Sequence, residues 1–337
     1  MSERIDPAAI QGIVARGYGS LHYSAFLLLG INDVAYARVW LGTLKVTSAA
    51  DAAEQTAVNL ALTYRGLQAL GLDAAALEGI GDELREGMVS AHRRRILGDH
   101  DQSAPERWDW GGARPEQGLG VGTGAGIAAG LAAGAALPQT PAREGEVEAG
   151  GTRQVWGDEI DMLLMLYAEK PEQLQDLIDR AIAEEGKRGV TVFKVIKGSW
   201  LEGNKEHFGF ADGIAQPGIK GLGRPGRRAN AVAAGEVLLG HVNEYGRYPL
   251  SPKVAAPTPL LPDAGGGPGR DFGRDGSYLV MRQLEQDVPA FWKWVTEAAA
   301  RVRVGETLPG DDPRIVLASK MVGRWPSGAP LALCPKR

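Results

Sequence analysis

Four short apolar runs constrain the fold of this chain more than any other feature. They lie at residues 22–31, 57–63, 160–167 and 190–196. Each is rich in aliphatic or β-branched residues, which is typical of buried strands. Helix-forming segments follow the first and third runs. Because the links are short and no phosphate-binding glycines follow a strand, this order indicates an α+β fold rather than a nucleotide-binding fold.

Helices are predicted at about 33–44, 65–70, 73–96 and 171–186. Asn32 or Asp33 can cap the first of them. Its apolar positions suit one face, and these are Val34, Val39, Leu41 and Leu44. A second apolar face is formed in the last helix by Leu174, Leu177, Ile178 and Ile182. We expect both helices to bury these faces.

The amino-acid composition limits which binding partners and which cellular compartment are expected for this protein. The 337 residues are 44% hydrophobic and 23% charged, with a net charge of −4. This length allows two domains and a sizeable core. A mildly acidic balance gives no reason to expect nucleic acid or an anionic membrane as a partner. The single cysteine, Cys334, and the absence of a secretory layout in the first 20 residues predict a cytoplasmic protein.

Residues 118–137 interrupt this composition, because they consist mostly of glycine and alanine and carry no charge. A membrane helix is one interpretation, by length and by the GxxxG steps of Gly126, Gly130 and Gly134. A dinucleotide loop is another, since GxGxxA occurs from Gly120, although no strand precedes it. A low-complexity insertion is the favoured interpretation, because so many glycines specify no structure. No function is assigned to it.

Residues 206–218, EHFGFADGIAQPG, form the stretch in which a side chain suited to catalysis is built into a loop. Its glycines permit backbone conformations closed to other residues. Asp212 follows Phe208 and Phe210, and a carboxylate held against apolar surface can be desolvated, which raises its pKa. The alternative is a simple Asp-Gly turn in which Asp212 bonds its own backbone. Spacing alone favours the turn.

The wider string resembles one family. Residues 209–213 read Gly-Phe-Ala-Asp-Gly, the GxxDG pattern of the dye-decolorizing (Dyp-type) haem peroxidases. Further segments resemble the family in the same order, at residues 5–31, 273–294 and 321–331. The resemblance implies a b-type haem (heme b) with Asp212 on its distal side as acid and base. The cofactor-binding residues that it implies are Phe210, Ala211, Asp212, Gly213, Ile214 and Ala215.

The resemblance also implies a duplicated ferredoxin-like fold of antiparallel sheets and flanking helices. The first copy would span 1–205, with the low-complexity insertion at about 112–155, and the distal loop would span 206–230. A partial second copy would span 231–337. Its strands are expected at 235–241 and 277–282, with a helix at about 287–302.

The resemblance also implies a histidine that binds the haem iron as its axial ligand, and the matching segments do not contain it. Members of this family carry it downstream of the segment that resembles residues 321–331, so the sequence is interpreted as a truncated member with an incomplete second copy. His241 is the one candidate substitute. His207 is expected to order the loop by hydrogen bonding. Lys220, Arg224, Arg227 and Arg228 form either a solvated basic loop or a contact to the haem propionates, and the solvated loop is favoured.

The function implied is oxidation of dyes or phenols by hydrogen peroxide, with a small organic reductant as the second partner. Three alternatives stay open: a haem-free binding module, release of haem iron on the same fold, and a membrane-associated protein anchored by 118–137. Self-association into a homo-oligomer is also open.

Overall fold

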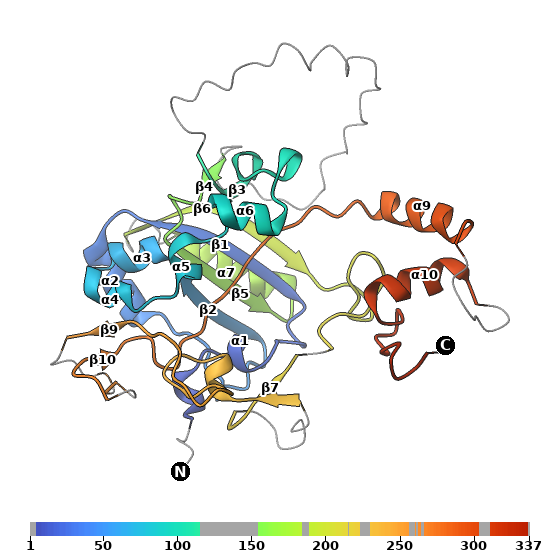
Figure 1. Ribbon diagram of the computed structural model, residues 1–337. Coiled ribbons are helices and arrows are strands. Elements are labelled where there is room, and N and C mark those ends of the chain that lie inside the picture. The colour runs from blue at the N-terminus through green and yellow to red at the C-terminus, as the bar shows by residue number, and fades with distance from the viewer. Residues whose placement is uncertain are drawn as a thin grey trace. The chain divides into compact units, whose positions relative to one another are not determined.

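A computed structural model describes residues 5–114, 154–183, 189–214, 216–222, 230–255, 260, 262–263, 266–302 and 311–335. The Gly/Ala stretch 118–137 lies outside these residues. Contacts divide the chain into two compact units, whose main helices and strands are labelled in Figure 1. The first comprises 1–198, 219–224 and 232–278, and the second comprises 199–218, 225–231 and 279–337.

A four-stranded sheet is the centre of the first unit, with strand order β2-β5-β1-β6. Its strands are β1 (Tyr23–Ile31), β2 (Thr56–Leu62), β5 (Met162–Ala168) and β6 (Val190–Ser199). β5 is antiparallel to β1 and to β2, and Leu164 is the register partner of Leu27 on one side and of Leu60 on the other. All four predicted strands are thus confirmed. With one helix after β1 and one after β5, the order is that of a ferredoxin-like sheet, and the expected mixture of helix and antiparallel sheet is confirmed.

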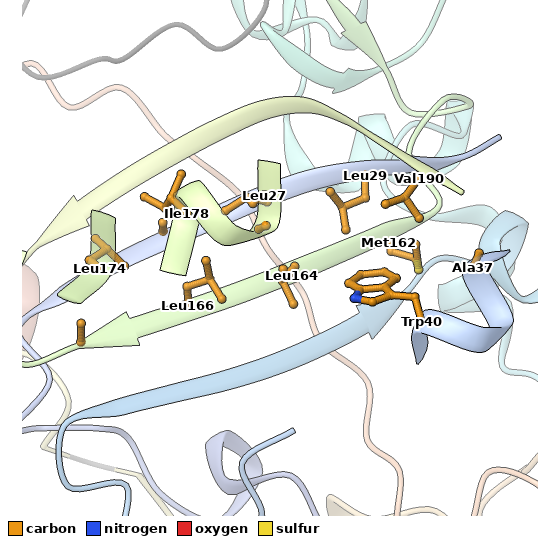
Figure 2. Close-up of a cluster of buried hydrophobic side chains, with 13 residues drawn as sticks. Leu27, Leu29, Ala37, Trp40, Met162, Leu164, Leu166, Leu174, Ile178 and Val190 are labelled. Carbon is orange, nitrogen blue, oxygen red and sulfur yellow. The ribbon is translucent and has the colours of Figure 1, made fainter. Parts of the chain in front are cut away.

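Two helices bury one face of this sheet: α2 (Val34–Thr43) and α7 (Pro171–Ala183). Figure 2 shows the result, with Ile178 of α7 beside Leu27 and Trp40 of α2 next to Met162. Leu27 and Met162 are fully buried, and each such side chain contributes about 2 kcal/mol by leaving water.

The predicted face of α2 was only partly right. Val39 is 68% exposed, whereas Ala37 and Trp40 are buried. Leu41 and Leu44 pack against the core cluster as expected. The helix begins where the sequence indicated, because the Asp33 carboxylate accepts hydrogen bonds from two backbone amides of its first turn.

The single helix predicted over 73–96 is wrong. Three short helices replace it, α4 (Ala74–Glu78), α5 (Asp82–Glu86) and α6 (Ala91–Leu97), after α3 (Tyr64–Ala69). Gly87 ends α5 with a φ of 61°, a conformation that glycine adopts without strain. Gly79 lies between α4 and α5, and a β-carbon there would sit 2.6 Å from the Ser251 carbonyl oxygen.

Short elements complete the first unit. They are the 3₁₀ turns at Pro7–Ala9, Asp101–Ser103, Pro105–Arg107 and Ala234–Glu236, helix α1 (Gly12–Ala15), the parallel pair β3 (Trp110–Gly112) and β4 (Val155–Trp156), and the antiparallel pair β9 (Lys253–Val254) and β10 (Arg270–Asp271). A further pair is formed by β7 (Gly218–Ile219) and β8 (Ala231–Val232).

The strands expected at 235–241 and 277–282 do not form. A turn replaces the first of them, in which the Leu238 amide donates to the Ala234 carbonyl. Leu238 is buried there against Ile5, Ile10 and Ile219. The apolar run is therefore buried by an irregular turn and not by a sheet, and 277–282 belongs to no strand.

The second unit contains α9 (Val288–Ala299) and α10 (Pro313–Val322). α9 confirms the helix expected at 287–302, and the Asp287 carboxylate caps it by accepting from the Ala290 amide. α10 was not predicted, although Asp312 and Pro313 form an ordinary helix start. A small buried cluster in this unit comprises Phe210, Val295 and Ala318.

Candidate active site

The loop that carries Asp212 is a tight reversal of the chain. Lys205 and Ala211 form an isolated antiparallel bridge. Between them, the Glu206 amide donates to the Phe210 carbonyl and the Gly209 amide donates to the Glu206 carbonyl, both at 2.9 Å. Gly209 has a φ of 95°, a region that favours glycine. The glycine in Phe-Gly-Phe therefore permits the chain to reverse its direction, so that Ala211 lies opposite Lys205.

The side chain of Glu206 stabilises this reversal by hydrogen bonds to its backbone. Its two carboxylate oxygens accept one backbone amide each, from Phe208 at 2.7 Å and from Phe210 at 2.8 Å. Hydrogen bonds to a charged acceptor are stronger than neutral ones. The sequence pattern had assigned the ordering of the loop to His207, which is wrong: His207 is exposed, and no hydrogen bond of its side chain is present among the described residues.

Asp212 follows this reversal, and one of its two carboxylate oxygens accepts a hydrogen bond. Oδ1 accepts from the Gly213 amide at 2.6 Å, and the Asp212 amide donates to the Asn204 carbonyl at 2.9 Å. The turn chemistry expected of Asp-Gly is therefore present, with Gly213 at a φ of 68°. The Asp212 side chain is exposed, so the burial expected of it is absent. Its Oδ2 has no protein partner in the described part of the chain.

The loop borders a hollow of about 470 Å³ in the second unit. The size lies within the range of sites that bind organic ligands. Phe208 packs against Phe291 of α9 with the two rings tilted and their centroids 4.7 Å apart, and both rings adjoin the cluster that contains the buried Phe210. Of the predicted cofactor-binding residues, all line the hollow except Ala215, which lies outside the described residues.

A second segment that resembles the family reaches the same hollow. The Ala211 amide donates to the Pro326 carbonyl at 3.0 Å, and Arg324 lines the wall with Nη1 donating to the Gly328 carbonyl. Sequence reasoning did not name Arg324 as a site residue, although it lies within the segment 321–331 that carries part of the resemblance. It also missed Glu206, Gln216, Phe291 and Val322, which line the hollow.

The lining suits one face of a flat, largely apolar group, because aromatic and aliphatic side chains surround two carboxylates and a guanidinium. It supplies no ligand for iron, since none of the described residues that line it is histidine, cysteine, methionine or tyrosine. No cluster of histidine, cysteine and acidic side chains suited to a metal ion occurs within the described ranges. The described residues therefore fit a haem on one face and leave its axial ligand unassigned.

The candidate axial histidine has another role in the first unit. His241 is 3% exposed, and its Nε2 lies 2.6 Å from the Asp275 carboxylate. It is not among the residues that line the hollow. Lys220 is not among the lining residues either, and its ammonium pairs with Glu244 at 2.9 Å. Arg224, Arg227 and Arg228 lie outside the described residues.

Comparison with known proteins gives relatives of one kind. No family model matches the chain. A dye-decolorizing peroxidase of Exidia glandulosa is 39% identical over 134 residues, which cover 40% of this chain and 22% of that protein. The dye-decolorizing peroxidase AauDyP1 of Auricularia auricula-judae is 34% identical over 166 residues, 48% of this chain and 28% of that protein. Over these segments the chain is similar to dye-decolorizing peroxidases.

Solved structures show the fold as well. A dye-decolorizing peroxidase in complex with 2,6-dimethoxyphenol superposes with a TM-score of 0.65 at 22% identity, over 98% of this chain and 62% of that one. The fold is thus the Dyp-type α+β fold. The matched segments span about a quarter of the length of the two curated dye-decolorizing peroxidases. No helix among the described residues is both long and apolar enough to cross a bilayer.

Proposed function

We propose that the chain functions in a Dyp-type haem peroxidase, which oxidises dyes or phenolic compounds with hydrogen peroxide. The observation that carries the proposal is the placing of Asp212 at an apolar hollow with one oxygen engaged and one unengaged. Its Oδ1 is held by the Gly213 amide, which would leave Oδ2 for an incoming reactant. This is the arrangement that a positioned acid and base requires.

Asp212 would act on the proton of the peroxide. In its charged form the carboxylate is an acceptor only, and Oδ2 takes the proton from one peroxide oxygen. When the O–O bond breaks, the same carboxyl would return that proton to the other peroxide oxygen, which leaves as water. The Gly213 hydrogen bond keeps the carboxyl group in one orientation during both transfers.

Haem b would supply the redox chemistry when bound, and the protein would supply binding and orientation. Phe208 and Ile214 offer apolar surface to a flat ring, and Arg324 offers a positive charge to its propionates. A small organic reductant would restore the resting state. The cytoplasm is the compartment that we propose, in agreement with a single, exposed cysteine.

Replacement of Asp212 by asparagine tests the proposal. Asparagine keeps the shape of the side chain but cannot take the proton, so turnover of peroxide should fall by about 10²–10⁴-fold. Absorption of bound haem should remain. The matched control is Asp176→Asn on α7, since Asp176 is also an exposed carboxylate, and it should leave turnover unchanged. Equal turnover in both variants would refute the role of Asp212.

A haem-free binding module is the second candidate, because the described lining of the hollow contains no iron ligand. Titration of the purified 337-residue chain with hemin separates the two. A stoichiometric Soret band supports the peroxidase. The module is supported instead if the band is absent while an apolar dye still binds to the chain, and if Phe208→Ala abolishes that binding.

A further inference from the structure

A second hollow lies within the first unit, at the end of the sheet where β1 finishes and β5 and β6 begin. It measures about 190 Å³, and polar side chains dominate its walls. Those that bear on its chemistry are Asn32, Arg65, Glu159, Asp161 and Thr191, with Phe193 as an apolar surface. A hollow of this size is smaller than the sites of drug-sized ligands.

Asp161 is the most informative residue of this hollow, because it is 1% exposed. Its Oδ2 accepts from the Ile31 amide at 2.7 Å. Its Oδ1 accepts no hydrogen bond, although the Arg65 Nε lies 3.2 Å away. The ion pair with Arg65 compensates the charge of this carboxylate but leaves Oδ1 without a hydrogen bond, and buried acceptors in native proteins usually have a hydrogen-bond donor.

The surrounding groups can both donate and accept. Arg65 is half-exposed, and its two terminal nitrogens have no protein partner within the described part of the chain. The Asn32 amide donates to the Thr191 hydroxyl oxygen at 3.2 Å. The Asn32 carbonyl oxygen then remains as an acceptor, and the Thr191 hydroxyl proton remains as a donor.

The charges of the side chains that line the hollow favour a neutral ligand over an anion or a cation. Arg65 balances Asp161, and the Arg114 guanidinium lies 3.3 Å from the Glu159 carboxylate. An anion would meet two carboxylates, and a cation would meet the Arg65 guanidinium. A neutral ligand with several hydroxyl groups would meet neither obstacle, since one hydroxyl can donate to Asp161 while another oxygen accepts from Arg65.

We propose that this hollow binds a small neutral polyhydroxylated molecule, with the chemistry of a monosaccharide or a cyclic polyol. One hydroxyl donates to Asp161 Oδ1, and a neighbouring oxygen accepts from Arg65. The Phe193 ring lies against the carbon skeleton. Gly30 permits this ring position, because a β-carbon at residue 30 would lie 2.5 Å from Phe193 Cε2.

Amide NMR of the ¹⁵N-labelled full chain, titrated with myo-inositol, tests the site. The Ile31 amide donates to Asp161, so its shift should move and saturate, together with those of Asn32 and Thr191. Arg65→Gln should abolish the saturation. Arg85→Gln is the matched control, because both arginine side chains are 49% exposed and each pairs with an aspartate. The control should titrate as the unchanged protein does.

Other outcomes overturn the proposal. Shifts that grow linearly with inositol and never saturate would mean that the hollow holds only water. Saturation that persists in Arg65→Gln would place binding elsewhere. Tighter binding of glycolate than of inositol would make this an anion site. If Arg65→Gln fails to fold, Thr191→Val serves instead, since it removes one hydroxyl while keeping the side-chain shape, and affinity should fall several-fold.

Discussion

The two units of this chain bury apolar surface to very different extents. The first unit contains a continuous core between a four-stranded sheet and two helices. The second has a much smaller cluster around Phe210 and Val295, and it leaves Trp294 55% and Ile214 48% exposed. Burial of apolar area is the main source of stability. Stability is therefore concentrated in the first unit, whereas the candidate peroxidase chemistry lies on the second.

The strongest test of this difference is a cavity in the sheet core. Leu27→Ala removes a side chain with no exposure, and we expect a loss of about 3 kcal/mol in the free energy of unfolding. Urea denaturation followed by far-UV circular dichroism measures it. Val295→Ala in the second unit should leave the transition of the sheet in place.

Leu250→Ala is the control for that experiment, because Leu250 is 69% exposed. It should change the free energy of unfolding by less than about 0.5 kcal/mol. Equal losses for Leu27→Ala and Leu250→Ala would show that the sheet is not the stable part of the molecule.

The sequence predicted the first unit better than the second, and the reason is physical. The four strands could be recognised because each run is short and rich in aliphatic or β-branched residues, and Asp33 caps α2 through neighbouring residues. The same kind of apolar run at 235–241 folds as a buried turn, and nothing within the run distinguishes the two outcomes. The break at Gly79 depends on the approach of Ser251, which is distant in the sequence.

In the candidate site, too, some residues could be predicted from a local motif and others could not. Asp212 and the glycines beside it could be found from a local motif, and the Asp-Gly turn follows from those residues alone. Arg324 reaches the hollow from more than a hundred positions away, so no local pattern could place it there. Glu206 lies within the string that carries the resemblance, but its role depends on backbone amides that converge only once the loop has reversed. The catalytic role of Asp212 stays a prediction, as do the domain boundaries at 205 and 230.

A sharper test concerns the loop. Glu206→Ala removes both hydrogen bonds to the Phe208 and Phe210 amides, and we expect a local loss of about 2.5 kcal/mol. Hydrogen exchange of the Phe210 amide should accelerate by roughly 60-fold. Glu206→Gln keeps one acceptor and should lose about half of that free energy. The sheet should exchange as before.

Glu202→Ala is the matched control, because Glu202 is an exposed carboxylate in the same part of the chain. It should leave exchange of the Phe210 amide unchanged. If Glu206→Ala accelerated exchange throughout the sheet, the two units would not be energetically separate.

Alkaline pH should weaken the first unit through Tyr167 of β5. Burial raises the pKa of Tyr167 to about 12 from 10.0, and the nearby Tyr18 adds to the rise. The protonated phenol is favoured in the folded state, so this stability is present below pH 10 and is lost as the pH rises towards 12. We expect a loss of about 2 kcal/mol over that window.

Tyr167→Phe cannot ionise, so its stability should change less between pH 10 and 12 than that of the unchanged protein. Urea midpoints at a series of pH values measure this directly. Parallel curves for both proteins would contradict the burial of Tyr167 as the source of the effect.

The smallest expected effect compares two helix caps, one in each unit. Asp33 caps α2 and Asp287 caps α9, each through a carboxylate that accepts from backbone amides at about 3 Å. Replacement by alanine should cost about 1 kcal/mol in either helix. Asp33→Ala should lower the urea midpoint of the sheet, because α2 is part of the core cluster.

Asp287→Ala should instead accelerate amide exchange in the first turn of α9 and leave that midpoint unchanged. The same chemical change then produces a global effect in one unit and a local effect in the other, because only α2 is coupled to a large buried surface. A fall in the sheet midpoint for both variants would mean that α9 stabilises the whole chain, and that the contrast between the units is one of buried area alone.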